Sequence, residues 1–310
     1  MTNQLKFFVS LFFILSLMPQ KYTMAQETPH NLKDTLETVI QKFDGRAGIY
    51  VRHLGKNEEV AIHADDVFPT ASMIKVPIMI KIFDLIEQGK LNYGQKLVHK
   101  AEHNYTYEDD LINTSEIGSE FPLSKLIAIM ISLSDNTASL WLQDVAGTGT
   151  AINAWLKEHG YPYTRVNSRT KSREKEYDEH GWGQTTPREM AQLVYDIYER
   201  KVVSRAASEK MYRLLTRSYW DGEALSVIPP EVEVASKQGA VSQSKSEVVI
   251  VHAPTGSYLF CAITDNQPIK GYEADNPGFV FLRNVSEIIY NHYNPGSDYE
   301  PEISPEYYTQ

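Results

Sequence analysis

The sequence predicts a mixed α/β (α+β) fold, in which one antiparallel sheet is flanked by terminal helices and an all-α lobe is inserted between its strands. Strand-like runs occur near both ends of the 310 residues, at 47–64 and again at 232–265. Helical periodicity dominates the stretch between 72 and about 215. Because distant strands then share one sheet, we expect a cleft where the two lobes meet, and ligand sites favour such boundaries.

The N-terminal part is expected to begin with a helix. Apolar residues at 32, 36, 39, 40 and 43 have the spacing of an amphipathic helix. Two strand-like runs follow, AGIYVRHL and EEVAIHA, and the short linker GKN between them predicts a β-hairpin.

The middle of the chain is expected to be helical, and the strand pattern returns after it. The helical segments are KVPIMIKIFDLIEQGKL, PLSKLIAIMISLSD, ASLWLQDVAG, TAINAWLKEHG and TPREMAQLVYDIYERK. The later strands are EVEVASKQGA, SEVVIVHAP and GSYLFCAITD, and GFVFLRNVSEIIYNHY closes the domain as a helix. The sheet lobe is therefore expected at about 30–68 and 222–293, and the helical lobe at about 69–221.

Both ends of the chain are expected to lie outside this domain, which we place at 26–295. Lys6, the apolar run over 7–18 and Ala25 indicate a signal peptide over 1–25, so the mature chain is expected to be exported. The apolar run is too short to span a membrane. Residues 296–310 are acidic and aromatic and contain prolines, which indicates a tail outside the core.

Composition narrows the classes of partner and chemistry. A formal net charge of −10 argues against nucleic acid as the main partner. The single cysteine, Cys261, excludes an internal disulfide, and its strand-like surroundings are typical of a buried core thiol. The nine histidines form none of the spacings of a zinc hydrolase, so we expect no metal and no cofactor. A monomer without a stable membrane span is expected.

Serine–lysine pairs with the spacing S-x-x-K occur in several places, and the first of them begins an apolar helix. In PTASMIKVPI, Ser72 and Lys75 share one helix face, where free backbone N–H groups suit an oxyanion and a partly desolvated lysine could accept the serine proton. On this motif alone, a serine at a helix start with a snorkelling lysine is the simpler explanation. Two later pairs are interpreted as solvated surface: Ser168 with Lys171, and Ser242 with Lys245.

Two further motifs follow in the chain. SLSDNTAS places Ser134, Asp135 and Asn136 after an apolar helical run, where Asp or Asn would ordinarily cap a helix. SKQGA places Lys237 and Gly239 on a predicted strand. A glycine there commonly marks the close approach of a ligand or of another backbone.

With these three motifs in this order, the chain resembles the class A serine β-lactamases and the related penicillin-binding D,D-peptidases, whose signature is S-x-x-K, S-D-N and K-T-G. The resemblance covers about residues 30–293 and includes TTPREMA. It implies a β-lactamase/transpeptidase-like fold and a serine hydrolase of the bacterial periplasm, or a secreted one. It also implies that a β-lactam amide is opened through an acyl-enzyme.

The resemblance implies a role for each matching residue. Ser72 would be the nucleophile, Lys75 its proton partner, and Ser134 the relay that protonates the leaving nitrogen. The substrate would be held by Asn136, Lys237, Gln238 and Gly239, and the oxyanion by the backbone N–H groups of Ser72 and Ala240.

The chain departs from the family pattern in two places. Gln238 stands where threonine or serine is usual, so recognition of a substrate carboxylate is expected to change. In the active-site loop, Thr170 falls where class A enzymes carry the glutamate that activates the deacylating water, and Glu174 falls on their asparagine. The arginine and aspartate that tie this loop become Ser168 and Gly183.

Deacylation is therefore expected to be slow, with Glu174 as the candidate base if the loop folds differently. Glu176 and Glu179 are further candidates, although carboxylates in so charged a run are usually solvated. Two alternative functions stay open. One is a D,D-peptidase or other amidase or esterase acting on cell-wall peptides, and the other is a non-catalytic penicillin-binding receptor. In each case the partner is a small-molecule β-lactam or a cell-wall peptide.

Overall fold

An antiparallel sheet built from both ends of the chain is the centre of the fold in the computed structural model, which describes residues 31–105 and 110–302. Its five strands lie in the order β2-β1-β10-β9-β8, and β1 pairs with β10, so the N-terminal hairpin joins the C-terminal strands. The strands are β1 (Arg46–His53), β2 (Glu58–Ile62), β8 (Val234–Val241), β9 (Ser244–Ala253) and β10 (Gly256–Asp265). The predicted sheet is confirmed.

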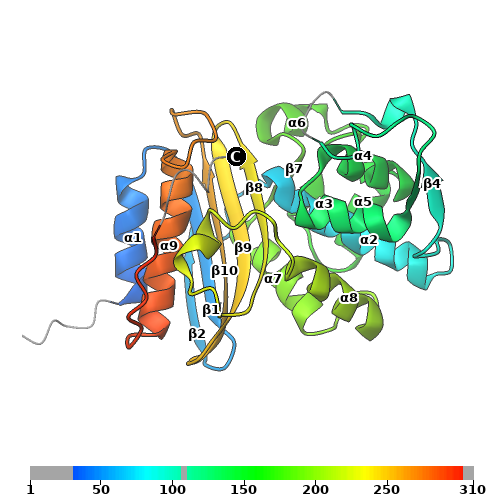
Figure 1. The fold of residues 1–310 in the computed structure, drawn as a ribbon. Helices are drawn as coiled ribbons and strands as arrows, with labels where there is room; N and C mark the ends of the chain where they lie inside the picture. Colours follow the sequence, from blue (N-terminus) through cyan, green and yellow to red (C-terminus); the bar gives the residue numbers. More distant parts are fainter. Residues whose placement is uncertain (1–30, 106–109, 303–310) are drawn as a thin grey trace, which may run out of the picture. The chain divides into compact units, whose positions relative to one another are not determined.

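Helices α1 (Leu32–Lys42) and α9 (Pro277–Tyr293) cover one face of this sheet (Figure 1). The side chain of Asn276 caps α9 by accepting a hydrogen bond from the N–H of Gly278, and the proline that follows the cap suits the first helical turn. Strand residues that point to this side pack with the two helices into one apolar core. The terminal helices therefore lie where the sequence predicts them.

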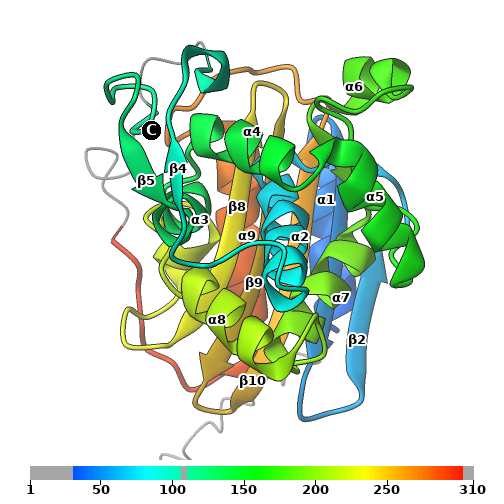
Figure 2. The same ribbon diagram turned by 90° about the vertical axis from the view of Figure 1, so that its right-hand side faces the viewer.

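The opposite face of the sheet is covered by the predicted helical lobe (Figure 2). Its central helix α2 is buried along most of its length, and α7 packs directly on β1, β9 and β10. The α-helices are α2 (Lys75–Glu87), α3 (Leu123–Ser132), α4 (Asn136–Val145), α5 (Thr148–Glu158), α6 (Glu174–His180), α7 (Pro187–Tyr198) and α8 (Arg205–Leu215). Short 3₁₀ turns occur at η1 (Ala71–Ile74), η2 (Ala101–His103) and η3 (Ala224–Val227).

Short strands inside the helical region were not predicted. They form two small antiparallel sheets, β3-β7-β6 and β4-β5. Each has only two or three residues, too few for an alternating pattern to stand out from the surrounding loop. Their bounds are β3 (Phe68–Pro69), β4 (Lys96–Val98), β5 (Glu120–Pro122), β6 (Arg165–Val166) and β7 (Gly183–Thr185).

The interpretation of these two later S-x-x-K pairs as solvated surface is wrong for one residue of each. Ser168 is buried and donates a hydrogen bond to the side-chain oxygen of Gln143 at 3.0 Å. Lys245 is buried on β9, where its Nζ donates to the carbonyl of Val241 at 2.7 Å and lies 4.6 Å from the ring centre of Tyr272. Burial lowers the pKa of Lys245 to about 8. The sequence neighbours of Lys245 are polar (QSKSE), so the sequence does not indicate that its side chain is buried on a strand.

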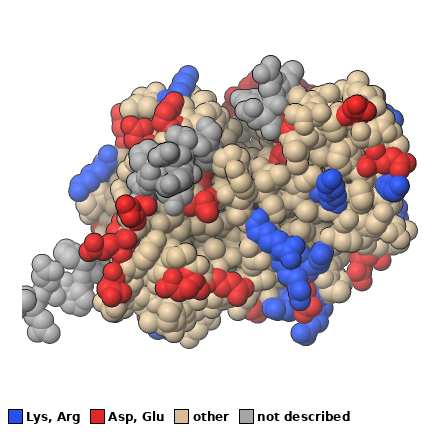
Figure 3. All heavy atoms as spheres, viewed as in Figure 1, with Lys and Arg blue, Asp and Glu red and all other residues tan. Residues whose placement is uncertain are grey.

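The described part of the tail lies on the surface, where Tyr299 lines a pocket together with Pro229 and Pro230. Within residues 31–105 and 110–302, no helix is long and apolar enough to cross a membrane. Figure 3 shows acidic and basic side chains interspersed over one face of the molecule. The predicted signal peptide and the tail beyond 302 fall outside the described residues.

Candidate active site

The nucleophile candidate lies on a tight turn that leads into the buried helix α2. Ser72 is half-buried in η1, and α2 begins at Lys75. Ala71, just before the serine, has φ of +43°, a left-handed conformation that is uncommon for residues other than glycine. Pro77 is the third residue of α2, where its missing N–H removes no helical hydrogen bond. The start of this helix therefore agrees with the prediction.

The amine of Lys75 is fully buried and joins two motifs. Its Nζ lies 3.0 Å from Ser72 Oγ, 3.1 Å from Ser134 Oγ and 2.8 Å from Asn136 Oδ1. It also donates to the backbone carbonyl of Ser134. The S-x-x-K and S-D-N motifs thus meet at one nitrogen atom.

Burial lowers the pKa of Lys75 from its ordinary value of 10.5 to about 7, because removal from water disfavours the charged form. The carboxylates of Asp110 and Asp135 act in the opposite direction and limit the fall. A substantial fraction of this amine is consequently neutral near pH 7, and a neutral amine can accept a proton from a neighbouring hydroxyl.

The turn that presents Ser134 is held by two buried aspartates. Ser134 has φ of +60°, and Asp135 caps α4 by accepting from the N–H of Ala138 at 2.7 Å. Asp110 accepts from the N–H of Asn136 at 3.0 Å and from that of Thr137 at 2.8 Å. These charged hydrogen bonds offset the cost of the left-handed conformation, about 1–3 kcal/mol.

The sequence did not identify Asp110. It lies 26 residues before Asn136 in a polar run, EDDLINTSE, that carries no motif. Only the three-dimensional arrangement shows that it supports the turn.

The third motif reaches the same place from the sheet. Lys237 is buried on the edge strand β8, and its Nζ donates to Ser134 Oγ at 3.0 Å and to the carbonyl of Gln238 at 2.8 Å. It also donates to Gln238 Oε1. Burial, assisted by the nearby charge of Lys75, lowers the pKa of Lys237 well below its ordinary value. Ser134 thus lies between two buried amines.

Gly239 lets β8 approach the serine turn closely, as a glycine in this strand predicted. A Cβ atom at position 239 would lie 2.8 Å from the backbone nitrogen of Ser72 and 2.7 Å from the carbonyl oxygen of Thr70. No side chain fits there without moving one backbone away from the other.

The backbone N–H of Ala240 points off the free edge of the sheet. Ala240 is paired with Lys245 of β9. The backbone N–H of Lys245 donates to the hydroxyl of Thr264 on β10, and that hydroxyl donates to the carbonyl of Lys245. In an antiparallel ladder the N–H and carbonyl of one residue point the same way, so this pair shares no hydrogen bonds across β8 and β9. The N–H groups of Ala240 and Ser72 are then both available near the serine.

The loop between β6 and β7 is tied at its base to the serine turn. β7 pairs with both β6 and β3, and the N–H of Thr70 donates to the carbonyl of Gly183 at 2.9 Å. A Cβ atom at Gly183 would lie 2.5 Å from the side chain of Ile74, so the aspartate that the family carries here has no room.

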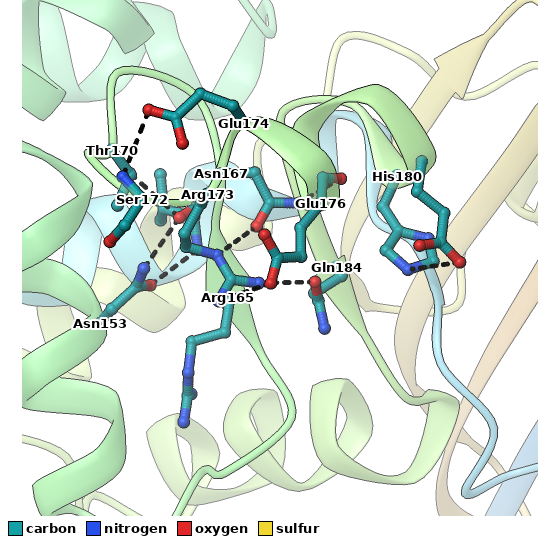
Figure 4. A network of polar contacts seen from close by, with 12 residues as sticks. Asn153, Arg165, Asn167, Thr170, Ser172, Arg173, Glu174, Glu176, His180 and Gln184 are labelled. Atoms are coloured by element: carbon teal, nitrogen blue, oxygen red, sulfur yellow. Dashed lines mark hydrogen bonds and ion pairs between the residues drawn. The ribbon is translucent and has the colours of Figure 1, made fainter.

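Inside the loop, Arg173 supplies the tie that Ser168 and Gly183 do not. Figure 4 shows its guanidinium between Asn167 and Gln184, with both side-chain oxygens at 2.7 Å. These acceptors are neutral, and ion pairs add to them: the Arg173 guanidinium lies 3.9 Å from the carboxylate of Glu176, and Arg169 pairs with Asp144 on α4.

Thr170 and Glu174, the two residues at the positions of the water-binding pair, have other contacts. The hydroxyl of Thr170 donates to backbone carbonyls of the loop itself, at 2.9 Å for Ser168, and its side chain packs against Gly149 of α5. Glu174 is the exposed first residue of α6, and its carboxylate accepts from the N–H of Ser172 at 3.3 Å (Figure 4).

Comparison with known proteins identifies the family. Residues 31–293 match the model described as the Beta-lactamase enzyme family. The chain belongs to this family. It is 22% identical over 301 residues to "Beta-lactamase VEB-1" of Pseudomonas aeruginosa, covering 92% of this chain and 95% of that relative. It is 24% identical to "Beta-lactamase BRO-1" of Moraxella catarrhalis, covering 79% and 78%. The chain is thus a serine β-lactamase-like hydrolase.

Solved structures agree with this fold. "Structure of PBP-A" superposes with a TM-score of 0.76 at 22% identity and covers 86% of this chain and 97% of its own. A β-lactamase from Chitinophaga pinensis DSM 2588 superposes with a TM-score of 0.74 at 19% identity, covering 84% and 98%. The predicted β-lactamase/transpeptidase-like fold is confirmed.

Replacing Asp110 with alanine is expected to lower the free energy of unfolding by about 2–3 kcal/mol, because buried N–H groups at the start of α4 lose a charged acceptor. Urea denaturation followed by circular dichroism measures this. The matched control is Asp144→Ala, since Asp144 is an exposed carboxylate paired with Arg169 and its loss is expected to cost at most about 1 kcal/mol. Equal losses in the two variants would contradict the role of Asp110.

Proposed function

We propose that this protein is an exported serine hydrolase that β-lactams acylate on Ser72 and from which the acyl group leaves slowly. The observation that supports this most strongly is the convergence of four groups: the hydroxyls of Ser72 and Ser134 and the amines of Lys75 and Lys237. The signal peptide predicted over 1–25 supports export to the bacterial periplasm or the medium.

In the proposed acylation, neutral Lys75 takes the proton of Ser72 as its Oγ attacks the β-lactam carbonyl carbon. The negative oxygen is stabilised by the N–H groups of Ser72 and Ala240, each such donor being worth about 10²–10³ in rate. The C–N bond then breaks, Ser134 gives its proton to the leaving nitrogen, and Lys75 returns a proton to Ser134. Lys75 Nζ is within 3.1 Å of both hydroxyls, so the two proposed transfers that involve Lys75 need no intermediate group.

The proposed binding roles follow from the same geometry. Asn136, whose side-chain oxygen is on Lys75, keeps its amide N–H₂ for the side-chain amide of the substrate. Lys237 and Gln238 face the substrate carboxylate from β8, and Gly239 allows the strand to lie close enough to Ser72 for both oxyanion donors to act.

Slow deacylation is proposed because the loop offers no placed carboxylate at position 170. A hydroxyl such as that of Thr170 is too weak a base to activate water at neutral pH, and this hydroxyl is already bonded to loop carbonyls. Acylation and deacylation need different residues, and the contacts of the described residues support proposed roles in the first step alone.

The second candidate function is a D,D-peptidase or related amidase or esterase acting on cell-wall peptides. The absence of a glutamate at position 170 favours the peptidase function. A peptidase without this glutamate would pass the acyl group of a peptide to another acceptor, whereas the acyl group of a β-lactam would stay on the serine. One solved structure with this fold is the L158E mutant of PBP-A in an acyl-enzyme complex with penicillin G.

Mixing the mature protein with benzylpenicillin is expected to add the full mass of the drug to Ser72, and Ser72→Ala is expected to abolish the adduct with an unchanged circular dichroism spectrum. Intact mass spectrometry over several hours measures this. The control is Ser242→Ala, an exposed serine of another S-x-x-K pair, which should label normally. Rapid hydrolysis without a lasting adduct would favour an efficient β-lactamase, whereas no reaction would overturn the proposal.

The acylation rate constant is expected to rise with pH, with a midpoint near 7, and to level off above about 8, because Lys75 must be neutral to accept the serine proton. Adduct formation between pH 5 and 9 measures this. The same pKa shift affects the free energy of unfolding. The unfolded chain binds more protons than the folded chain between about pH 7 and 10.5, so the protein gains stability as pH rises through this range. An acylation rate that still climbs at pH 9 would contradict the lowered pKa.

Glu174→Gln is expected to leave the half-life of the adduct unchanged within about twofold, because this carboxylate is exposed and bonded to the start of its own helix. Recovery of free protein after removal of excess drug, followed by mass, measures the half-life. Glu158→Gln, an exposed carboxylate at the end of α5, is the control. A tenfold longer half-life in Glu174→Gln alone would show that Glu174 is the deacylation base.

A further inference from the structure

Every N–H of the Lys237 amine already has a partner within the protein. The three N–H groups of an ammonium are matched by three acceptors: Ser134 Oγ, the carbonyl oxygen of Gln238 and Gln238 Oε1. If the amine is neutral, it can accept from the Ser134 hydroxyl and donate its two N–H groups to the two oxygens of Gln238. In both protonation states, a substrate carboxylate that comes to Lys237 must displace one of these partners.

The partner that a substrate would displace is the side chain of Gln238. The carbonyl of Gln238 belongs to the strand β8, and Ser134 is needed for proton transfer. Oε1 is the remaining partner, and it belongs to a side chain that has no proposed part in proton transfer. Threonine or serine, the usual residues of the family here, are two bonds shorter and end in a hydroxyl that can donate to a carboxylate. Gln238 instead brings an acceptor to the place where the carboxylate is expected.

The chemistry of the amide makes this placement selective. An ionised carboxylate only accepts hydrogen bonds, so it is repelled by Oε1. Turning the amide over would offer N–H to the carboxylate but would aim the same N–H₂ group at the donors of Lys237. Moving the side chain away is restricted, because Gln238 is only 5% exposed. A neutral group that donates a hydrogen bond meets Oε1 with no rearrangement.

We propose that Gln238 is a specificity-determining residue that closes the carboxylate subsite at Lys237, so that the protein disfavours substrates with a free carboxylate there and accepts a neutral donor such as a primary carboxamide. The inference rests on the proposed function, because it concerns the substrate of the same Ser72 site. If a shorter side chain replaces Gln238, the preference for the neutral group is expected to weaken, and substrates with a carboxylate are expected to react relatively faster.

The experiment compares benzylpenicillin with its primary carboxamide, which differ only in this group. For each compound the second-order rate constant of Ser72 acylation is measured by intact mass in the wild type, Gln238→Thr and Gln238→Ala. We expect the ratio of the carboxylate constant to the carboxamide constant to rise about tenfold or more in both variants, the effect of one well-placed hydrogen bond. Gln243→Thr, an exposed glutamine in the turn between β8 and β9, should leave the ratio unchanged.

The outcomes separate this inference from the proposed function. If the wild type is acylated but the ratio changes by less than twofold in both variants, the proposed role of Gln238 is overturned. The acyl-serine proposal is then unaffected. If neither compound labels Ser72, the proposed function fails. The same pair is then titrated by calorimetry against Ser72→Ala with and without Gln238→Thr. A tenfold gain in carboxylate affinity over carboxamide affinity would still support the closed subsite, and equal affinities would refute it.

Discussion

The site depends on the burial of one amine. Lys75 would be an ordinary protonated lysine in water, and the proposed use of its amine as a base rests on its burial at the start of the apolar helix α2. A buried charge is costly, so the amine is surrounded by oxygens from Ser72, Ser134 and Asn136. Asp110 and Asp135 limit the fall in the pKa of Lys75, because without their negative charge the buried lysine would bind a proton still more weakly. The turn that holds Ser134 is therefore part of the same electrostatic unit.

This dependence also explains why two lobes are required. The amine is supplied by a helix, the second hydroxyl by a turn between helices, and the second amine by a strand from the other end of the chain. None of these elements could desolvate the site alone. The sheet must therefore be complete, with β8 at its edge and in contact with η1, before Ser72 acquires its surroundings.

Much of this arrangement could be predicted from sequence, because it is encoded in local patterns. The strand-like run AGIYVRHL and the helical period of α1 and α9 agree with the structure, and three short motifs contain the four converging groups. The errors arise where distant residues decide the outcome. Lys245 was misjudged because its sequence neighbours are polar, although β9 turns the side chain inward. Asp110 carries no motif, and the hold of Arg173 on Asn167 and Gln184 exists only once the loop is folded.

The strand β7 divides the neighbouring loop into two parts with different freedom to vary. Its base is fixed by pairing with β6 and β3, and Gly183 lies against Ile74 with no space to spare, so a change there would shift the turn that carries the nucleophile. The tip over 171–181 is held mainly through Arg173, which donates to Asn167 and Gln184, and much of α6 is exposed. Residues of the tip other than Arg173 can therefore change in number or charge without disturbing the turn that carries Ser72.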